Sequence, residues 1–207
     1  GKRLAQLLRK RRILSASLAV ALVTGSVPLA AQGADMPPPG LGALRQDQVA
    51  VRLGTASLAI RVLPLDERVI RLLAPDTYSS LAELKRSRAA EIAAAARQAG
   101  LDSATVFVVT FFGMAPNARF DPDQLYLSSQ NAFFRPMGVV PMTPQWGETQ
   151  LGQRQQAVAI YLFQPGIPIL QPFTVFYDGQ PSTAWESTLR VLENERARVL
   201  ARAASRP

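Results

Sequence analysis

The chain has 207 residues, of which 48% are hydrophobic and 18% charged, a balance typical of one globular domain with an added segment. It has no His and no Cys, which excludes imidazole or thiolate metal ligands, Ser-His-Asp and Cys-His catalysis, and disulfides. We therefore expect a protein that is not an enzyme and needs no cofactor or metal.

The net charge of +8 is concentrated at the start of the chain. Six of the 23 basic residues precede the first acidic residue, Asp35, which leaves 17 basic against 15 acidic residues in the remainder. Basic residues are not interleaved with aromatic ones as on a nucleic-acid stacking surface. The pattern predicts no nucleic-acid partner and a basic cytoplasmic tail over residues 1–12.

An uncharged, mostly apolar segment follows at residues 13–34. The 22 residues between Arg12 and Asp35 would span about 33 Å as a helix, enough to cross a bilayer core of about 30 Å. Two interpretations stay open, an uncleaved transmembrane anchor in the lipid bilayer and a cleavable signal peptide. The basic tail predicts a cytoplasmic N-terminus and a periplasmic C-terminal domain on the inner membrane; cleavage would instead release a soluble periplasmic protein.

Small residues recur along this segment. Ser17, Ala21 and Gly25 lie four positions apart and would share one helix face, which permits close packing against another membrane helix. Residues 35–42 (DMPPPGLG) are typical of an extended Pro/Gly linker that holds the following domain, residues 43–207, away from the membrane.

Residues 43–207 contain both strand and helix patterns. Alternating apolar residues predict a hairpin at residues 48–53 and 57–63, and a run that is apolar on both faces predicts a central strand at 105–112. Helices are expected at 66–73, at 81–99 with Ser80 and Glu83 as a capping box, and at 184–204. Further strands are expected at 124–128, 133–140, 156–163 and 172–177.

These elements predict an α+β fold. A single transmembrane or signal helix would precede an antiparallel β-sandwich-like domain, for which an immunoglobulin-like form is one option, with two packed helices. The lack of a regular strand–helix–strand rhythm argues against a doubly wound sheet.

Asp121 and Asp123 form an acidic run whose residue types occur in calcium sites and acid–base pairs, but its spacing favours an Asx turn that introduces a strand. Two proline-rich loops, at residues 140–147 and 164–172, are more distinctive because they are apolar. Their side chains could contact a partner or close the ends of the sandwich, and both interpretations stay open. The candidate contact residues are Met142, Trp146, Ile167, Ile169 and Leu170.

Together these features predict a non-enzymatic accessory or scaffolding subunit of a larger inner-membrane complex, of which respiratory and photosynthetic assemblies are examples. Its partners would be integral membrane proteins of that complex. A secreted periplasmic binding or adaptor domain is the alternative, and a hydrolase built on carboxylates is a weaker one.

Overall fold

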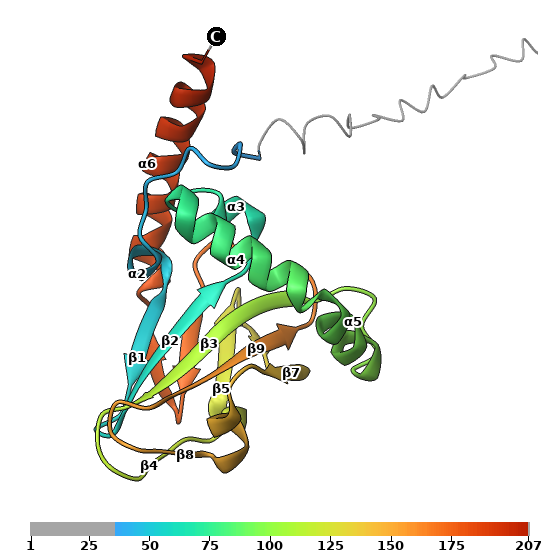
Figure 1. Cartoon of the computed structure of the whole chain (residues 1–207), viewed down its shortest axis with the longest axis vertical. Helices are drawn as coiled ribbons and strands as arrows, with labels where there is room; N and C mark the ends of the chain where they lie inside the picture. The colour runs from blue at the N-terminus through green and yellow to red at the C-terminus, as the bar shows by residue number, and fades with distance from the viewer. Residues whose placement is uncertain (1–35, 207) are drawn as a thin grey trace, which may run out of the picture. The chain divides into compact units, whose positions relative to one another are not determined.

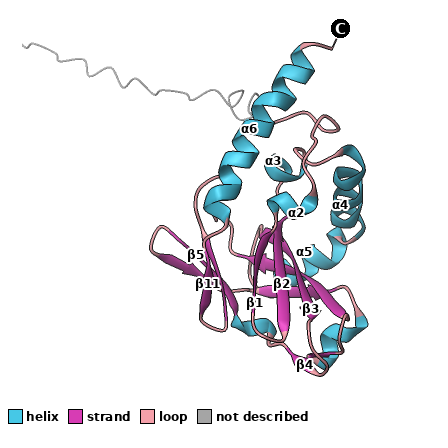
Figure 2. Cartoon of the chain, turned by 90° about the vertical axis from the view of Figure 1, so that its left-hand side faces the viewer, coloured by secondary structure: helices cyan, strands magenta, loops and turns pink. Residues whose placement is uncertain are grey.

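The computed structural model describes residues 36–206, which form an α+β domain with two facing antiparallel sheets and a long C-terminal helix (Figures 1 and 2). The predicted α+β class is confirmed. Residues 1–35, and with them the predicted tail, span and first linker residue, lie outside the described residues. The helices are α2 (Gln46–Val49), α3 (Glu67–Ile70), α4 (Pro75–Ser87), α5 (Ala89–Gln98) and α6 (Trp185–Ala204), with short 3₁₀ helices η1 (Pro122–Gln124) and η2 (Pro144–Glu148).

The larger sheet has five strands in the order β1 (Val51–Gly54), β2 (Leu58–Pro64), β3 (Thr105–Gly113), β9 (Gln156–Phe163) and β7 (Gly138–Pro141). Each neighbouring pair is antiparallel. The hairpin β1–β2 and the central strand β3 confirm the sequence predictions. β3 has apolar side chains on both faces. One face contributes to the core between the sheets, and a helix covers part of the other face.

The smaller sheet has the order β11 (Gln180–Ser182), β10 (Thr174–Tyr177), β5 (Leu125–Ser129) and β6 (Ala132–Phe134). A third pair, β4 (Ala118–Arg119) with β8 (Gln150–Leu151), lies at the lower end in Figure 1. Left-handed backbone at Asp178 (φ 48°) and Gly179 (φ 74°) closes the tight β10–β11 hairpin.

One strand prediction was wrong. Residues 133–140 were expected to be a single strand, but they divide into β6 and β7, which belong to different sheets. Pro136 lies between the two strands and has no amide hydrogen to donate to a ladder, so the pairing ends there. The chain then crosses to the larger sheet, where the Met137 amide donates to the Leu162 carbonyl at 2.8 Å.

The helix predicted at 81–99 also differs from the structure. It begins earlier, at Pro75, whose ring suits the first helical position, and it is interrupted at Arg88 between α4 and α5. Ser80 does not cap it; its hydroxyl donates to the Asp76 carbonyl within the helix at 3.0 Å. α5 packs on the outer face of the larger sheet, where Ala96 contacts a cluster that includes Ile160 and Leu162.

Residues 36–42, expected to be a spacer, instead pack against the domain. Leu41 is buried, and a Cβ on Gly42 would lie 2.2 Å from the Leu72 backbone carbon, so only glycine fits there. The Arg71 guanidinium donates to the Pro37 carbonyl, and Arg202 of α6 donates to the Leu41 carbonyl at 2.7 Å. This segment is therefore part of the folded unit.

Aromatic rings form much of the core between the sheets. Phe111 of β3 lies 5.5 Å from Tyr177 of β10 between ring centroids, and Trp185 of α6 stacks on Phe173 at 4.9 Å. Tyr161 of β9 is fully buried, and its hydroxyl donates to the Pro122 carbonyl at 2.9 Å. These contacts tie both sheets and α6 into one core.

The buried Tyr161 predicts a loss of stability in alkali. Burial raises the pKa of Tyr161 far above its unfolded value of 10.0. Its contribution is fully present below pH 10.0 and is lost as the pH rises through that value toward the higher pKa of the folded state, because the unfolded chain releases the proton first. We expect the free energy of unfolding to fall by up to about 1.4 kcal/mol per pH unit from this group alone.

Urea titrations between pH 8 and pH 11.5 would measure this effect. Tyr161→Phe should lose about 1 kcal/mol at pH 8 with the hydrogen bond but show a shallower alkaline decline than the unmodified protein. An unchanged slope in the variant would contradict the assignment to Tyr161.

Candidate interaction surfaces

The most unusual exposed feature is a group of aromatic side chains on the outer face of the smaller sheet. We define the aromatic face as Tyr126 of β5, Phe133 of β6 and Phe176 of β10, with the adjacent Arg135. Residue alternation along each strand produces it: Leu125, Leu127, Val175 and Tyr177 point into the core, so the residues between them face outward.

The rings of the aromatic face contact one another. Tyr126 and Phe176, which are cross-strand partners, stack with centroids 4.7 Å apart and planes 3° apart. Phe133 lies 6.1 Å from Tyr126 and is 68% exposed, and the Arg135 guanidinium carbon lies 5.2 Å from the centre of the Tyr126 ring. The result is a flat aromatic surface with a cation at one side.

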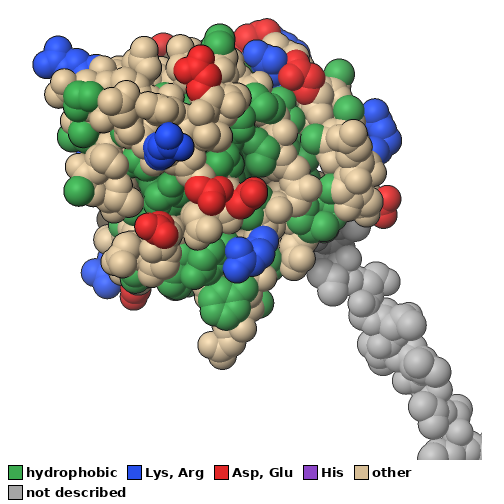
Figure 3. Space-filling model, turned by 90° about the horizontal axis from the view of Figure 1, so that it is seen from below, with side chains coloured by type: hydrophobic (Ala, Val, Ile, Leu, Met, Phe, Trp, Pro, Cys, Tyr) green, Lys and Arg blue, Asp and Glu red, His purple; other side chains and the backbone are tan. Residues whose placement is uncertain are grey.

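Exposed hydrophobic residues alone would not mark a site. Figure 3, the view from below, shows hydrophobic side chains at the surface among charged ones, as is usual for soluble domains. The aromatic face differs because three large rings are neighbours on one sheet. Contiguous patches of this kind are typical of binding surfaces. Sequence reasoning passed over it because Phe133, Tyr126 and Phe176 become neighbours only once the strand order is known.

The two apolar loops have a different environment. Trp146, on η2, is buried and lies 5.4 to 5.8 Å from the rings of Phe111, Phe120 and Tyr161. Ile167 and Ile169 are also buried, and the Ile169 carbonyl accepts a 2.9 Å hydrogen bond from the Trp185 indole. The burial of these three side chains fits the interpretation in which the loops close the sandwich.

The remaining loop candidates are more accessible. Leu170 is 42% exposed, and Met142 is half-buried against the cluster under α5. A partner contact through these loops stays a prediction and would fall mainly on Leu170. The span residues Ser17, Ala21 and Gly25 lie outside the described residues. Among residues 36–206, no helix combines the length and the apolar character needed to cross a membrane.

The acidic run forms the predicted turn. Asp121 caps η1, because its Oδ1 accepts the Asp123 amide at 3.0 Å. The Asp121 amide in turn donates to the Tyr177 hydroxyl at 3.0 Å, which fixes the turn against the smaller sheet. In the described part of the chain, no three His, Cys, Asp or Glu side chains are placed to hold a metal ion.

A second cluster of charges lies beside α3, where a groove of about 560 Å³ is partly lined by Asp66, Glu67 and Lys85. Its charges are paired with one another. Asp66 caps α3 and contacts Arg68 at 2.7 Å, and Glu67 contacts Arg71 at 2.8 Å. Burial raises the pKa of Asp66, but the hydrogen bonds from the Arg68 side chain and amide outweigh this and lower it overall. These side chains are paired with one another within the protein, so little unpaired charge is available in the groove to bind a ligand.

Comparisons with protein-family models, curated proteins and solved structures found no match. Within residues 36–206, the aromatic face is the largest group of aromatic side chains that are in contact with one another and lie outside the core.

Proposed function

We propose that the protein is a non-enzymatic accessory subunit of an inner-membrane assembly and binds a partner protein through the aromatic face. The observation that carries the proposal is the 68% exposure of Phe133 beside the stacked rings of Tyr126 and Phe176. Leaving such rings in water costs free energy that burial against a partner would recover.

The chemistry of the aromatic face suits a protein partner. The centres of protein interfaces are enriched in Tyr, Phe and Arg and depleted in Lys, Glu and Asp. The aromatic face contains the first three types and no acidic side chain. Ser128 and Thr174, cross-strand partners on the same face, are polar residues of the kind found at interface rims.

We propose in addition that the chain is anchored in the inner membrane. Residues 13–34 would anchor the chain in the bilayer as a single span, with residues 1–12 in the cytoplasm and the described domain in the periplasm. We also propose that the described domain is an immunoglobulin-like sandwich. If the segment is a cleaved signal, the aromatic face would serve a soluble periplasmic adaptor in the same way.

A photocrosslinking amino acid at position 133 of the full chain tests the docking surface in intact membranes. We expect one discrete crosslinked product whose second component is an integral membrane protein. Without the crosslinking amino acid, Phe133→Ser should reduce the amount of the same partner that co-purifies with the protein by about tenfold or more, because central aromatic residues dominate the binding free energy. Its thermal midpoint should stay nearly unchanged, since the side chain is exposed.

Leu200 of α6 provides the matched control because it is a hydrophobic side chain with 39% exposure on another element. A crosslinker at position 200 should give no such product, and Leu200→Ser should leave recovery unchanged. Equal crosslinking from both positions, or full recovery with Phe133→Ser, would refute the proposed surface.

A further inference from the structure

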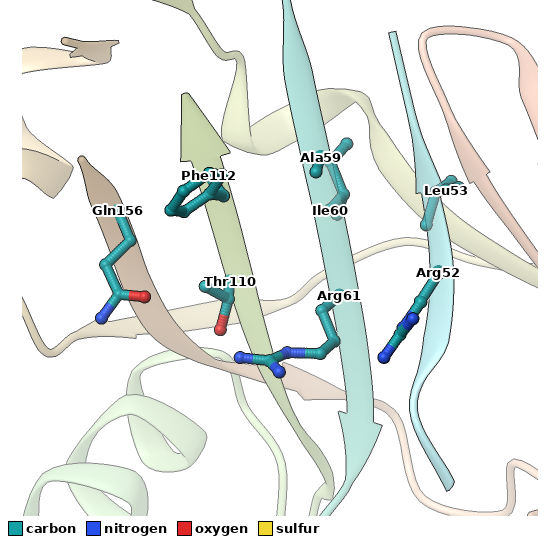
Figure 4. Close-up of a pocket in the computed structure, with 8 residues that line it drawn as sticks. All are labelled: Arg52, Leu53, Ala59, Ile60, Arg61, Thr110, Phe112 and Gln156. Carbon is teal, nitrogen blue, oxygen red and sulfur yellow. The ribbon is translucent and has the colours of Figure 1, made fainter. Parts of the chain in front are cut away.

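Among the helices that the structure describes, none covers the part of the larger sheet's outer face toward β1 and β2. α5 packs against β7 and β9, whereas the part toward β1 and β2 forms an open groove of about 430 Å³ (Figure 4). This volume lies in the range of small-molecule sites. The groove is lined by Arg52 of β1, Arg61 and Ala59 of β2, Thr110 and Phe112 of β3, and Gln156 of β9.

Two arginines lie side by side at one end of the groove. Arg52 and Arg61 are direct cross-strand partners, and Figure 4 shows the Arg61 side chain extending toward Thr110 with Arg52 alongside. Like charges opposite one another on an antiparallel pair destabilise a sheet. The two like charges therefore make this strand pair less stable than an uncharged pair would be. Residues that lower stability in this way are typical of binding sites.

Neighbouring carboxylates do not neutralise this pair. Asp47 lies 3.7 Å from Arg52, but its two oxygens already accept hydrogen bonds from Arg45 at 3.1 and 3.4 Å. Arg61 makes no ion pair with any residue between 36 and 206. Arg45 and Arg52 therefore share the Asp47 carboxylate, and Arg61 adds a further positive charge beside Arg52, so an anion would be attracted to this corner of the sheet.

The other end of the groove is apolar. The Phe112 ring lies beyond Thr110 in Figure 4, opposite Ala59 in the strand register. Thr110 is the cross-strand partner of Arg61, and Phe112 lies two residues farther along the same strand, so the backbone positions of the charged and apolar ends are separated by about 7 Å. A ligand that satisfied both ends would carry a charged head and an apolar body at about this spacing.

We infer that this groove binds a small amphipathic anion, with a carboxylate or phosphate head held by Arg52 and Arg61 and an apolar body against Phe112. The guanidinium fork matches the paired oxygens of either head group. The Thr110 hydroxyl, between the arginine and the ring in Figure 4, is positioned to donate to the same head. This site is separate from the aromatic face, which lies on the other sheet.

Calorimetric titration of the full chain with 4-phenylbutyrate at low ionic strength tests the inference. We expect saturable binding below about 1 mM, at least about tenfold weaker binding of the neutral 4-phenylbutanamide, and weak binding of inorganic phosphate, which lacks the apolar body. Arg61→Gln should weaken 4-phenylbutyrate binding by about tenfold or more, and Arg61→Lys by less.

Stability provides the second measurement. Because Arg61→Gln removes the cross-strand repulsion, its thermal midpoint should equal or exceed that of the unmodified protein. Arg119→Gln, which changes an exposed arginine on β4, should leave binding unchanged. Equal binding of the amide and the carboxylate, no binding of 4-phenylbutyrate up to about 10 mM, or a large loss of stability with Arg61→Gln would overturn the inference.

Discussion

Trp146→Ala is expected to lower the free energy of unfolding by about 3–5 kcal/mol, the range found when large buried aromatic residues are truncated. The indole is 8% exposed and contacts three core rings, those of Phe111, Phe120 and Tyr161. Its removal would leave a cavity that η2 cannot easily fill, because Pro144 restricts the backbone there. Urea denaturation followed by far-ultraviolet circular dichroism would measure the loss.

Leu170→Ala is the matched control. It lies in the second apolar loop but is 42% exposed, so we expect a change below about 0.5 kcal/mol. If Trp146→Ala cost less than about 1 kcal/mol while abolishing association with membrane partners, the indole would be an interface anchor and not a core residue. A large loss of stability would instead confirm that the loop closes the sandwich.

The loops show where sequence reasoning stops. Residues 140–147 are apolar and proline-rich, and a loop of this kind has the same composition whether it binds a partner or covers a core. Only the position of Trp146 over the rings of β3 and β9 separates the two cases. The composition alone therefore leaves both roles open, binding a partner and covering the core, and the tertiary structure is needed to distinguish them.

Local patterns were most informative where one interaction dominates. Residues 156–163 were predicted as a strand and form β9 with the same bounds, because the run is apolar and rich in β-branched and aromatic side chains. The Asp178-Gly179 turn is equally local. By contrast, the sequence alone does not show that the strand expected at 133–140 divides at Pro136, because the sheet that the following strand joins depends on the whole strand order.

Both proposed binding surfaces depend on strand register, which no local pattern contains. Arg52 and Arg61 are nine positions apart and become neighbours through the β1–β2 hairpin, whereas Tyr126 and Phe176 meet through a long-range pairing. In both cases the residues that face outward were visible as alternation, but their neighbours were not.

Arg202→Ala is expected to destabilise the domain by about 2–3 kcal/mol, less than for a fully buried pair because the arginine itself is 42% exposed. Its partner Glu195 is 2% exposed and accepts hydrogen bonds from Arg202 at 2.7 Å and from the Ala43 amide at 3.0 Å. Without Arg202, the carboxylate would stay buried with the Ala43 amide and the more distant Arg198, 3.6 Å away.

The loss should appear first where the chain enters the domain. Arg202 also donates to the Leu41 carbonyl, so the variant removes this contact and leaves the Glu195 carboxylate, which accepts the Ala43 amide, less firmly held. We expect the amides of residues 41–44 to exchange with solvent at least about tenfold faster in Arg202→Ala, while those of β3 and β9 follow the global stability. Hydrogen exchange read by mass spectrometry resolves the two groups.

The Glu195→Leu, Arg202→Leu double variant separates a buried-charge effect from a packing effect. If the cost of Arg202→Ala comes from leaving Glu195 buried with fewer partners, replacing both charges with apolar side chains should restore much of the stability. Arg190→Ala, an exposed arginine on the same helix, should change stability by less than about 0.5 kcal/mol. A double variant less stable than Arg202→Ala would mean that the ion pair and its bond to Ala43 are needed to hold the entering segment, and that apolar packing cannot replace them.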